Sequence, residues 1–188
     1  MKKFLMVFAA VVLAAVSMNA QPRAIGARLG YGAEVSYQHT LGNNMLSAEI
    51  SFPEFSGVGA AATYDWINPF GATFPWSHKG EWNWYMGVGA GLGYHCAYTN
   101  RVTYSDGTTA ASTHDGLFNV GVAGRIGFEY CFWFPLQLSL DWRPVIGPGI
   151  SWSSASAGGT TTTSSSTVGF YTNALYAGAI CLGVRYKF

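Results

Sequence analysis

The sequence predicts an all-β fold, an eight-stranded antiparallel up-and-down barrel whose strands cross a membrane. Three observations lead to it. Apolar side chains alternate with small or polar ones over most of the chain, as they do along strands that present two different faces. Only 10% of the 188 residues are charged, against roughly 25% in soluble domains. Beyond the N-terminal segment, no apolar run reaches the ~18 residues that a membrane-spanning helix needs.

The overall composition excludes several classes of protein. Aromatic residues make up 16% of the chain and apolar residues 49%, which excludes extensive disorder. The net charge is +1 and no Lys/Arg patch is present, so a nucleic-acid partner is not expected. The chain has the length of one domain. Cys96, Cys131 and Cys181 are an odd number of widely spaced cysteines, which indicates at least one free thiol and neither a disulfide framework nor a metal site.

The N-terminus is typical of a secretory signal peptide. Lys2 and Lys3 precede an unbroken apolar run from Phe4 to Val16, and small or polar residues follow. The run is too short for a membrane-spanning helix, which argues against a retained anchor. We expect cleavage after Ala20, although residues 15–17 would also serve, so residues 1–20 form the leader and 21–188 the barrel domain.

The polarity of the two strand faces indicates where the solvent lies. One face is apolar, and the other carries Gly, Ala, Ser and nearly all of the strand charges. Apolar side chains outside and ionic ones inside are expected of strands surrounded by lipid, where all backbone groups must be paired and the sheet must therefore close. The inward charged residues are expected to be Arg28, Glu34, Glu49, Asp65, Arg125, Glu129, Asp141, Arg143 and Arg185.

Aromatic residues are predicted to form two girdles around an aliphatic band, as in transmembrane barrels. With the mature N-terminus placed in the periplasm, the inner girdle comprises Tyr37, Tyr64, Trp66, Trp82, Trp84, Phe128, Tyr130, Tyr186 and Phe188. The outer girdle comprises Phe52, Tyr94, Phe118, Trp142 and Tyr176. Between them lie Leu29, Val35, Ile50, Ala62, Val88, Val122, Leu138 and Ile180. The alternative is that these aromatics fill a soluble β core, which the leader and the inward charges oppose.

The alternation places eight strands at 24–29, 33–40, 45–52, 58–66, 82–94, 117–131, 136–145 and 174–188. Residues 24–40 could be one long strand, but an even strand number favours a three-residue hairpin at 30–32, with Gly32 in the left-handed conformation. Residues 41–44 and 132–135 are expected to be tight inner turns, and 67–81 a longer connection. Residues 95–116 and 146–173 are expected to be long external loops, and the Ser/Thr-rich segment 151–167 a flexible one.

The C-terminus resembles the signal by which outer-membrane barrels are recognised for assembly. Gly183, Tyr186 and Phe188 match that pattern, whereas Cys181 replaces a usual polar residue. With its Gly/aromatic strands, the mature chain resembles the small barrels of the OmpA/OmpX/OmpW-like superfamily, without a peptidoglycan-binding domain. The resemblance implies residence in a Gram-negative outer membrane among lipids and lipopolysaccharide. It also implies export, periplasmic chaperones and insertion by the barrel-assembly machinery.

An eight-stranded barrel is just wide enough for side chains to fill it, so the inward arginines are expected to pair with the inward carboxylates. The sequence therefore predicts a structural or surface-contact barrel that catalyses no reaction and has no cofactor or metal. A passive channel for small solutes or hydrophobic molecules is the alternative.

A lipid A-modifying enzyme is a weaker alternative. Such barrels need Ser, His and a carboxylate at their rim. His39, His78, His95 and His114 do not have the His-x-Ser spacing of lipid A deacylases on a lipid-facing strand, and Ser77-His78 and residues 112–115 fall in expected connections. The sequence points to no particular surface ligand.

Overall fold

The computed structural model describes residues 23–30, 32–53, 56–70, 79–96, 98–103, 109–157, 160–173 and 179–188. The expected leader at 1–20 lies outside these residues. No helix in these ranges is long and apolar enough to cross a membrane. The strands are β1 (Arg23–Leu29), β2 (Gly32–Leu41), β3 (Asn44–Pro53), β4 (Gly57–Pro69), β5 (Gly80–His95), β6 (Tyr98–Thr103), β7 (Thr109–Phe132), β8 (Leu136–Trp142), β9 (Val145–Ala157), β10 (Thr160–Thr172) and β11 (Ile180–Lys187).

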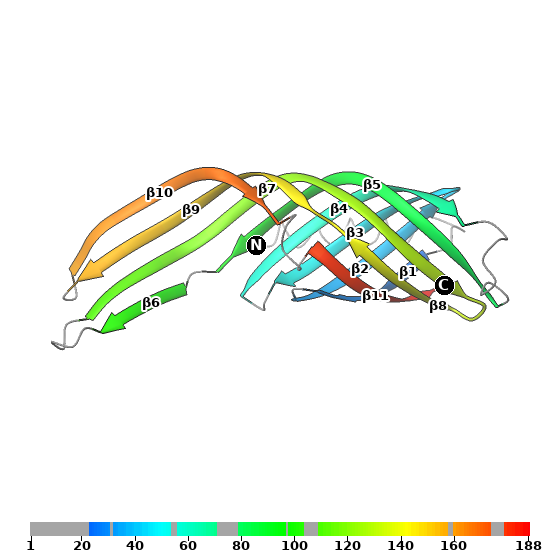
Figure 1. The fold of residues 1–188 in the computed structure, drawn as a ribbon, viewed down its shortest axis with the longest axis horizontal. Coiled ribbons are helices and arrows are strands. Elements are labelled where there is room, and N and C mark those ends of the chain that lie inside the picture. The colour runs from blue at the N-terminus through cyan, green and yellow to red at the C-terminus, as the bar shows by residue number, and fades with distance from the viewer. Residues whose placement is uncertain are drawn as a thin grey trace, which may run out of the picture.

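Eight of these strands close into an antiparallel barrel (Figure 1). Strands β1 to β5 pair in sequence order, and β5 pairs with β7. The C-terminal part of β7 pairs with β8, β8 with β11, and β11 with β1, which completes the cylinder. The predicted fold class is confirmed. We call the end at which Ala24 pairs with Lys187 the inner end, and the opposite end the outer end.

The short connections have the geometry that their residues predict. At the inner end, Leu41 pairs with Asn44 around a two-residue turn in which Gly42 has φ 61°. At the outer end, Leu29 pairs with Ala33, which confirms a hairpin rather than one long strand at 24–40. The detail predicted for that hairpin is wrong. Gly32 is the first residue of β2, and the described glycines with positive φ are Gly42 and Gly116.

The two segments expected to be long external loops are largely β-hairpins. Strand β7 extends from Phe132 to Thr109 and pairs there with β6, while β9 and β10 form a second hairpin beside it. These strands project beyond the barrel as one sheet (Figure 1). The prediction of a flexible loop at 151–167 is therefore wrong for the described residues, which belong to β9 and β10.

The last two predicted strands correspond to β8 and β11, and β9 and β10 lie between them in the sequence. Pro144 has no N–H to donate to a strand ladder, and the two strands separate at Arg143 and Pro144. β8 pairs with β11, whereas β9 pairs with β10. The strand predicted at 174–188 is β11, which begins at Ile180.

Side-chain exposure agrees with the predicted arrangement, in which apolar side chains lie outside the barrel and charged side chains lie inside. Large apolar side chains lie outside, among them Leu29, Val88 and Val122, the last 60% exposed. All nine charged residues predicted to face inward are buried: Arg28, Glu34, Glu49, Asp65, Arg125, Glu129, Asp141, Arg143 and Arg185. The interior is thus ionic and polar, and the exterior of the barrel is apolar.

Several of the described outward aromatics cluster toward the two ends of the barrel. At the inner end Trp82 lies 4.9 Å from Tyr130, and Tyr186 5.3 Å from Phe188, between ring centroids. At the outer end Tyr94 pairs across the sheet with Phe118. Trp142, expected in the outer girdle, pairs across the sheet with Ile180, as Tyr64 of the inner girdle does with Val88. Tyr176 lies outside the described residues.

Candidate functional site: an ionic lumen between two cavities

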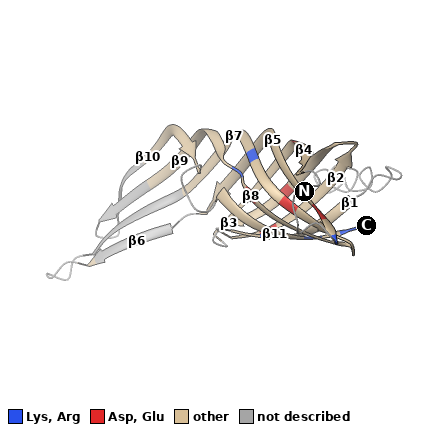
Figure 2. Ribbon diagram, turned by 45° about the vertical axis from the view of Figure 1, so that its right-hand side comes forward, with Lys and Arg blue, Asp and Glu red and all other residues tan. Residues whose placement is uncertain are grey.

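Three arginines and four carboxylates meet in the middle of the lumen. We call these seven residues the charge cluster: Arg28, Glu34, Glu49, Asp65, Arg125, Asp141 and Arg143. They come from β1, β2, β3, β4, β7, β8 and the β8–β9 break, and eight ion pairs join them. Figure 2 shows the acidic and basic positions on the strands that form the barrel wall.

Arg28 and Arg143 bind the carboxylates toward the outer end. Arg28 lies directly across the β1–β2 ladder from Glu34, and its Nη1 is 2.6 Å from the Glu34 carboxylate. Arg28 also contacts Asp141 through Nη2 and Glu49 at 3.6 Å. Arg143 reaches Glu34 at 2.6 Å and Glu49 at 3.4 Å. Glu34 and Glu49 therefore each have more than one cationic partner.

Arg125 crosses the lumen to three carboxylates. Its guanidinium nitrogens lie 3.0 Å from Glu49, 3.2 Å from Asp65 and 3.2 Å from Asp141. Arg125 and Asp65 both lie opposite Gly87 on the intervening strand β5. A Cβ at Gly87 would collide with the Asp65 carboxylate, so the glycine leaves the space in which the pair meets.

A second cross-lumen contact passes over Gly127. Tyr85 is fully buried, and its hydroxyl donates a hydrogen bond of 2.9 Å to Oδ2 of Asp141. The register places Gly127 between these two residues, and a Cβ there would lie 2.8 Å from Cζ of Tyr85. The Tyr85 ring also lies 5.0 Å from Cζ of Arg125, a cation–π distance.

Two of the nine predicted residues do not pair as expected. Arg185 donates to the hydroxyls of Ser36 at 3.0 Å and Ser139 at 2.7 Å. Glu129 accepts from Gln137 at 2.5 Å and from Asn83 at 3.3 Å. Within the part of the chain that the structure describes, neither residue has an ion pair, and both bind neutral side chains instead.

Cavities lie at both ends of the lumen, and the charge cluster occupies the space between them. The inner cavity, of about 340 Å³, is lined by polar residues that include Gln38, Asn83 and Glu129. The outer cavity, of about 330 Å³, is lined by Glu34 and Arg143 on its cluster side. The ion pairs of the charge cluster cross the lumen between these two cavities.

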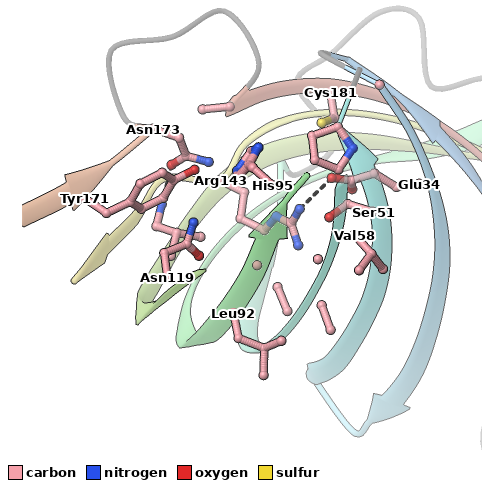
Figure 3. Close-up of a pocket in the computed structure, with 18 of the residues that line it drawn as sticks. Glu34, Ser51, Val58, Leu92, His95, Asn119, Arg143, Tyr171, Asn173 and Cys181 are labelled. Carbon is pink, nitrogen blue, oxygen red and sulfur yellow. Dashed lines mark hydrogen bonds and ion pairs between the residues drawn. The ribbon is translucent and has the colours of Figure 1, made fainter. Parts of the chain in front are cut away.

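The outer cavity contains polar and aromatic groups from several strands (Figure 3). His95 comes from the end of β5, Asn119 from β7 and Tyr171 from β10. The His95 and Tyr171 rings have centroids 6.3 Å apart. Asn119 is only 3% exposed, and its amide makes no hydrogen bond with a described residue.

The histidines and cysteines of the described residues are dispersed over several strands. His39 is buried on β2, His95 lines the outer cavity, His114 is on β7 and His78 lies outside the described residues. The described range holds no group of three or more His, Cys, Asp or Glu suited to a metal ion. Cys96, Cys131 and Cys181 are free thiols.

The C-terminal motif has two differently oriented parts. Gly183 faces the lumen, where an added Cβ would lie 3.2 Å from Cγ of Arg28. Tyr186 and Phe188 face outward, 53% and 73% exposed. The glycine therefore makes room for the charge cluster, while the two aromatics lie on the apolar exterior.

Only charged residues of the lumen were predicted as site residues, although its neutral members follow the same pattern. Tyr85, Asn119 and the serines that bind Arg185 alternate inward with the charged residues. The alternation places Tyr85 and Asn119 on the inward face, but it does not indicate which groups they meet there.

The fold and lumen together define a closed, eight-stranded barrel with an ionic interior and an apolar exterior. No protein-family model, curated protein or solved structure matches the chain.

Proposed function

We propose that this protein is an integral outer-membrane barrel of a Gram-negative bacterium, with a lumen closed by ion pairs and a role in membrane structure or surface contact. The observation that carries the proposal is the inversion of polarity around a closed sheet. Arg28 and Asp65 are 0% exposed inside, whereas Val122 and Leu29 are 60% and 63% exposed outside. Such a surface is unfavourable in water and suits hydrocarbon.

Outer-membrane residence explains several otherwise separate features. The N-terminal leader would direct export, and Gly183, Tyr186 and Phe188 would direct insertion by the barrel-assembly machinery after periplasmic chaperoning. The apolar exterior would contact outer-membrane lipids and lipopolysaccharide. These expectations follow from the resemblance to small OmpA/OmpX/OmpW-like barrels.

Cell fractionation tests the location. The expressed protein is expected in the outer-membrane fraction, cleaved after Ala20, and to change its mobility on SDS gels when boiled, as folded barrels do. A mature chain that is monomeric in water without detergent, with Arg125 and Arg185 accessible to solvent, would refute the proposal.

The divided lumen favours a closed barrel over a passive channel. Ion pairs of 2.6–3.4 Å connect Arg143 and Arg125 with Glu34, Glu49 and Asp65 across the interior. Purified protein in planar bilayers is therefore expected to give no steady conductance, and a steady open pore would contradict the proposal in favour of the channel. Expression is likewise expected to leave the mass of lipid A unchanged, because no acyl-transfer site is assigned.

The projecting sheet is the part best placed for surface contact. Ser151 and Thr167 are directly paired in the β9–β10 hairpin, so residues between them can be replaced by an Asn-Gly turn without separating the flanking strands. The shortened protein is expected to insert normally and to lose adhesion to surfaces that bind the intact protein. Unchanged adhesion would remove this hairpin as the contact region.

A further inference from the structure

The outer cavity has the dimensions and polar groups of a small-molecule site. Its volume of about 330 Å³ is at the lower end of the range of roughly 300–1,000 Å³ for ligand pockets. It is hollowed between the ends of β2, β4, β5, β7 and β10, with Arg143 and Glu34 at its cluster side (Figure 3). One ring-sized molecule fits such a space, and an oligomer does not.

One buried polar side chain that lines the cavity lacks a partner. Asn119 is 3% exposed, and its amide makes no hydrogen bond with any residue that the structure describes. Arg143 also lines the cavity, but its two terminal nitrogens already bind carboxylates. Buried polar side chains almost always have hydrogen-bond partners. A molecule in the cavity would supply the missing ones.

The charges around the cavity favour a neutral molecule. Nη2 of Arg143 lies 2.6 Å from Glu34, and Glu34 also accepts from Arg28 at 2.6 Å. A charged ligand would have to compete with these pairs, because each ion already has its counter-ion. The Asn119 amide offers both a donor and an acceptor. Hydroxyl groups can satisfy both.

The wall of the cavity also offers two aromatic rings and a partly apolar surface. The Tyr171 and His95 rings lie 6.3 Å apart between centroids and at 44° to one another, beside Leu117 and Val145. Aromatic side chains combine an apolar body with a polar edge. They therefore suit a ligand with a C–H face and hydroxyls around its rim.

We propose that the outer cavity binds a single neutral sugar ring, through Asn119 and against the rings of Tyr171 and His95. The ligand enters from the outer end, since the charge cluster closes the other side of the cavity. Sugar binding at this site requires the folded barrel and its cavity but not a membrane. The binding proposal is therefore independent of the proposed location in the outer membrane.

Binding to the folded barrel tests the proposal directly. The protein is prepared in a zwitterionic detergent, because a detergent with a sugar headgroup would compete. Glucose, galactose and N-acetylglucosamine are titrated while the ring signals of His95 are followed by NMR. Acetate, an anion, and glycine, a zwitterion, serve as comparisons that carry ionic groups. At least one sugar is expected to give a saturable shift in the millimolar range, and neither comparison molecule is.

Two asparagine variants locate the site. Asn119→Ala is expected to weaken sugar binding about tenfold, because one hydrogen-bonded group is lost from a buried position. Asn83→Ala is the matched control, since Asn83 lines the inner cavity, and it is expected to leave binding unchanged.

The proposal is overturned if none of the three sugars gives a saturable shift in the unmodified protein. It is also overturned if glycine or acetate binds instead, or if both variants weaken binding equally. The first two results need no variant, so they hold even where Asn119→Ala fails to fold.

Discussion

Replacing Arg125 by Met removes the cation that crosses the lumen. Arg125 is 3% exposed and pairs with Glu49, Asp65 and Asp141. After the change, Glu49 keeps Arg28 and Arg143, and Asp141 keeps Arg28. Asp65 keeps only the hydroxyls of Ser47 and Thr63, at 2.8 and 3.1 Å. One carboxylate, rather than three, is therefore left without a counter-ion.

An uncompensated buried charge costs about 3–5 kcal/mol, so the free energy of unfolding is expected to fall by that amount in Arg125→Met. Arg125→Lys is expected to lose less, because an ammonium keeps the charge but cannot reach three carboxylates at once. The double variant Arg125→Met/Asp65→Asn removes the unpaired charge. It is expected to recover at least about 2 kcal/mol of the loss.

Urea titration of the folded barrel, followed by tryptophan fluorescence and by mobility on unboiled gels, measures these differences. Glu81→Gln is the control, because Glu81 is exposed and such substitutions usually change stability by less than about 0.5 kcal/mol. The reasoning is refuted if Arg125→Met unfolds within about 1 kcal/mol of the unmodified protein, or if the added Asp65→Asn gives no recovery.

Three further predictions concern other parts of the barrel. Tyr85→Phe removes the donor to Asp141 and is expected to lower the free energy of unfolding by about 1–3 kcal/mol; an unchanged urea midpoint would contradict it. Gly127→Val places a branched side chain against Tyr85 and Asp141, and it is expected to abolish the heat-dependent gel shift of the folded barrel. A normal gel shift would show that folding does not need the space beside Gly127. Val122→Arg, on the outer face, is expected to cost about 2–4 kcal/mol in lipid vesicles. Equal stability of Val122→Arg and the unmodified protein in vesicles would count against lipid contact at Val122.

The wall of the barrel was predictable because polarity alternates with period two along each strand. Val120 and Val122 face out and Asn119 and Arg125 face in, and this follows from the pleat of a strand regardless of its neighbours. The hairpin at 30–32 was also predictable, because pairing of Leu29 with Ala33 keeps both apolar residues on one face.

The projecting hairpins were not predictable from the same pattern. Residues 151–157 and 160–167 are mostly Ser, Thr, Gly and Ala, so their two faces do not differ in polarity. Strand formation there depends on neighbouring strands rather than on local preference. β9 is hydrogen-bonded to both β7 and β10, and these partners decide its conformation.

The sequence by itself determined which side chains enter the lumen, because strand geometry sends alternate residues to opposite faces. Only the tertiary structure decided which of them meet. Arg125 pairs with Glu49, which is 76 positions away, while Arg185 binds serines instead of a carboxylate. Register and closure set those distances, and no local pattern encodes them.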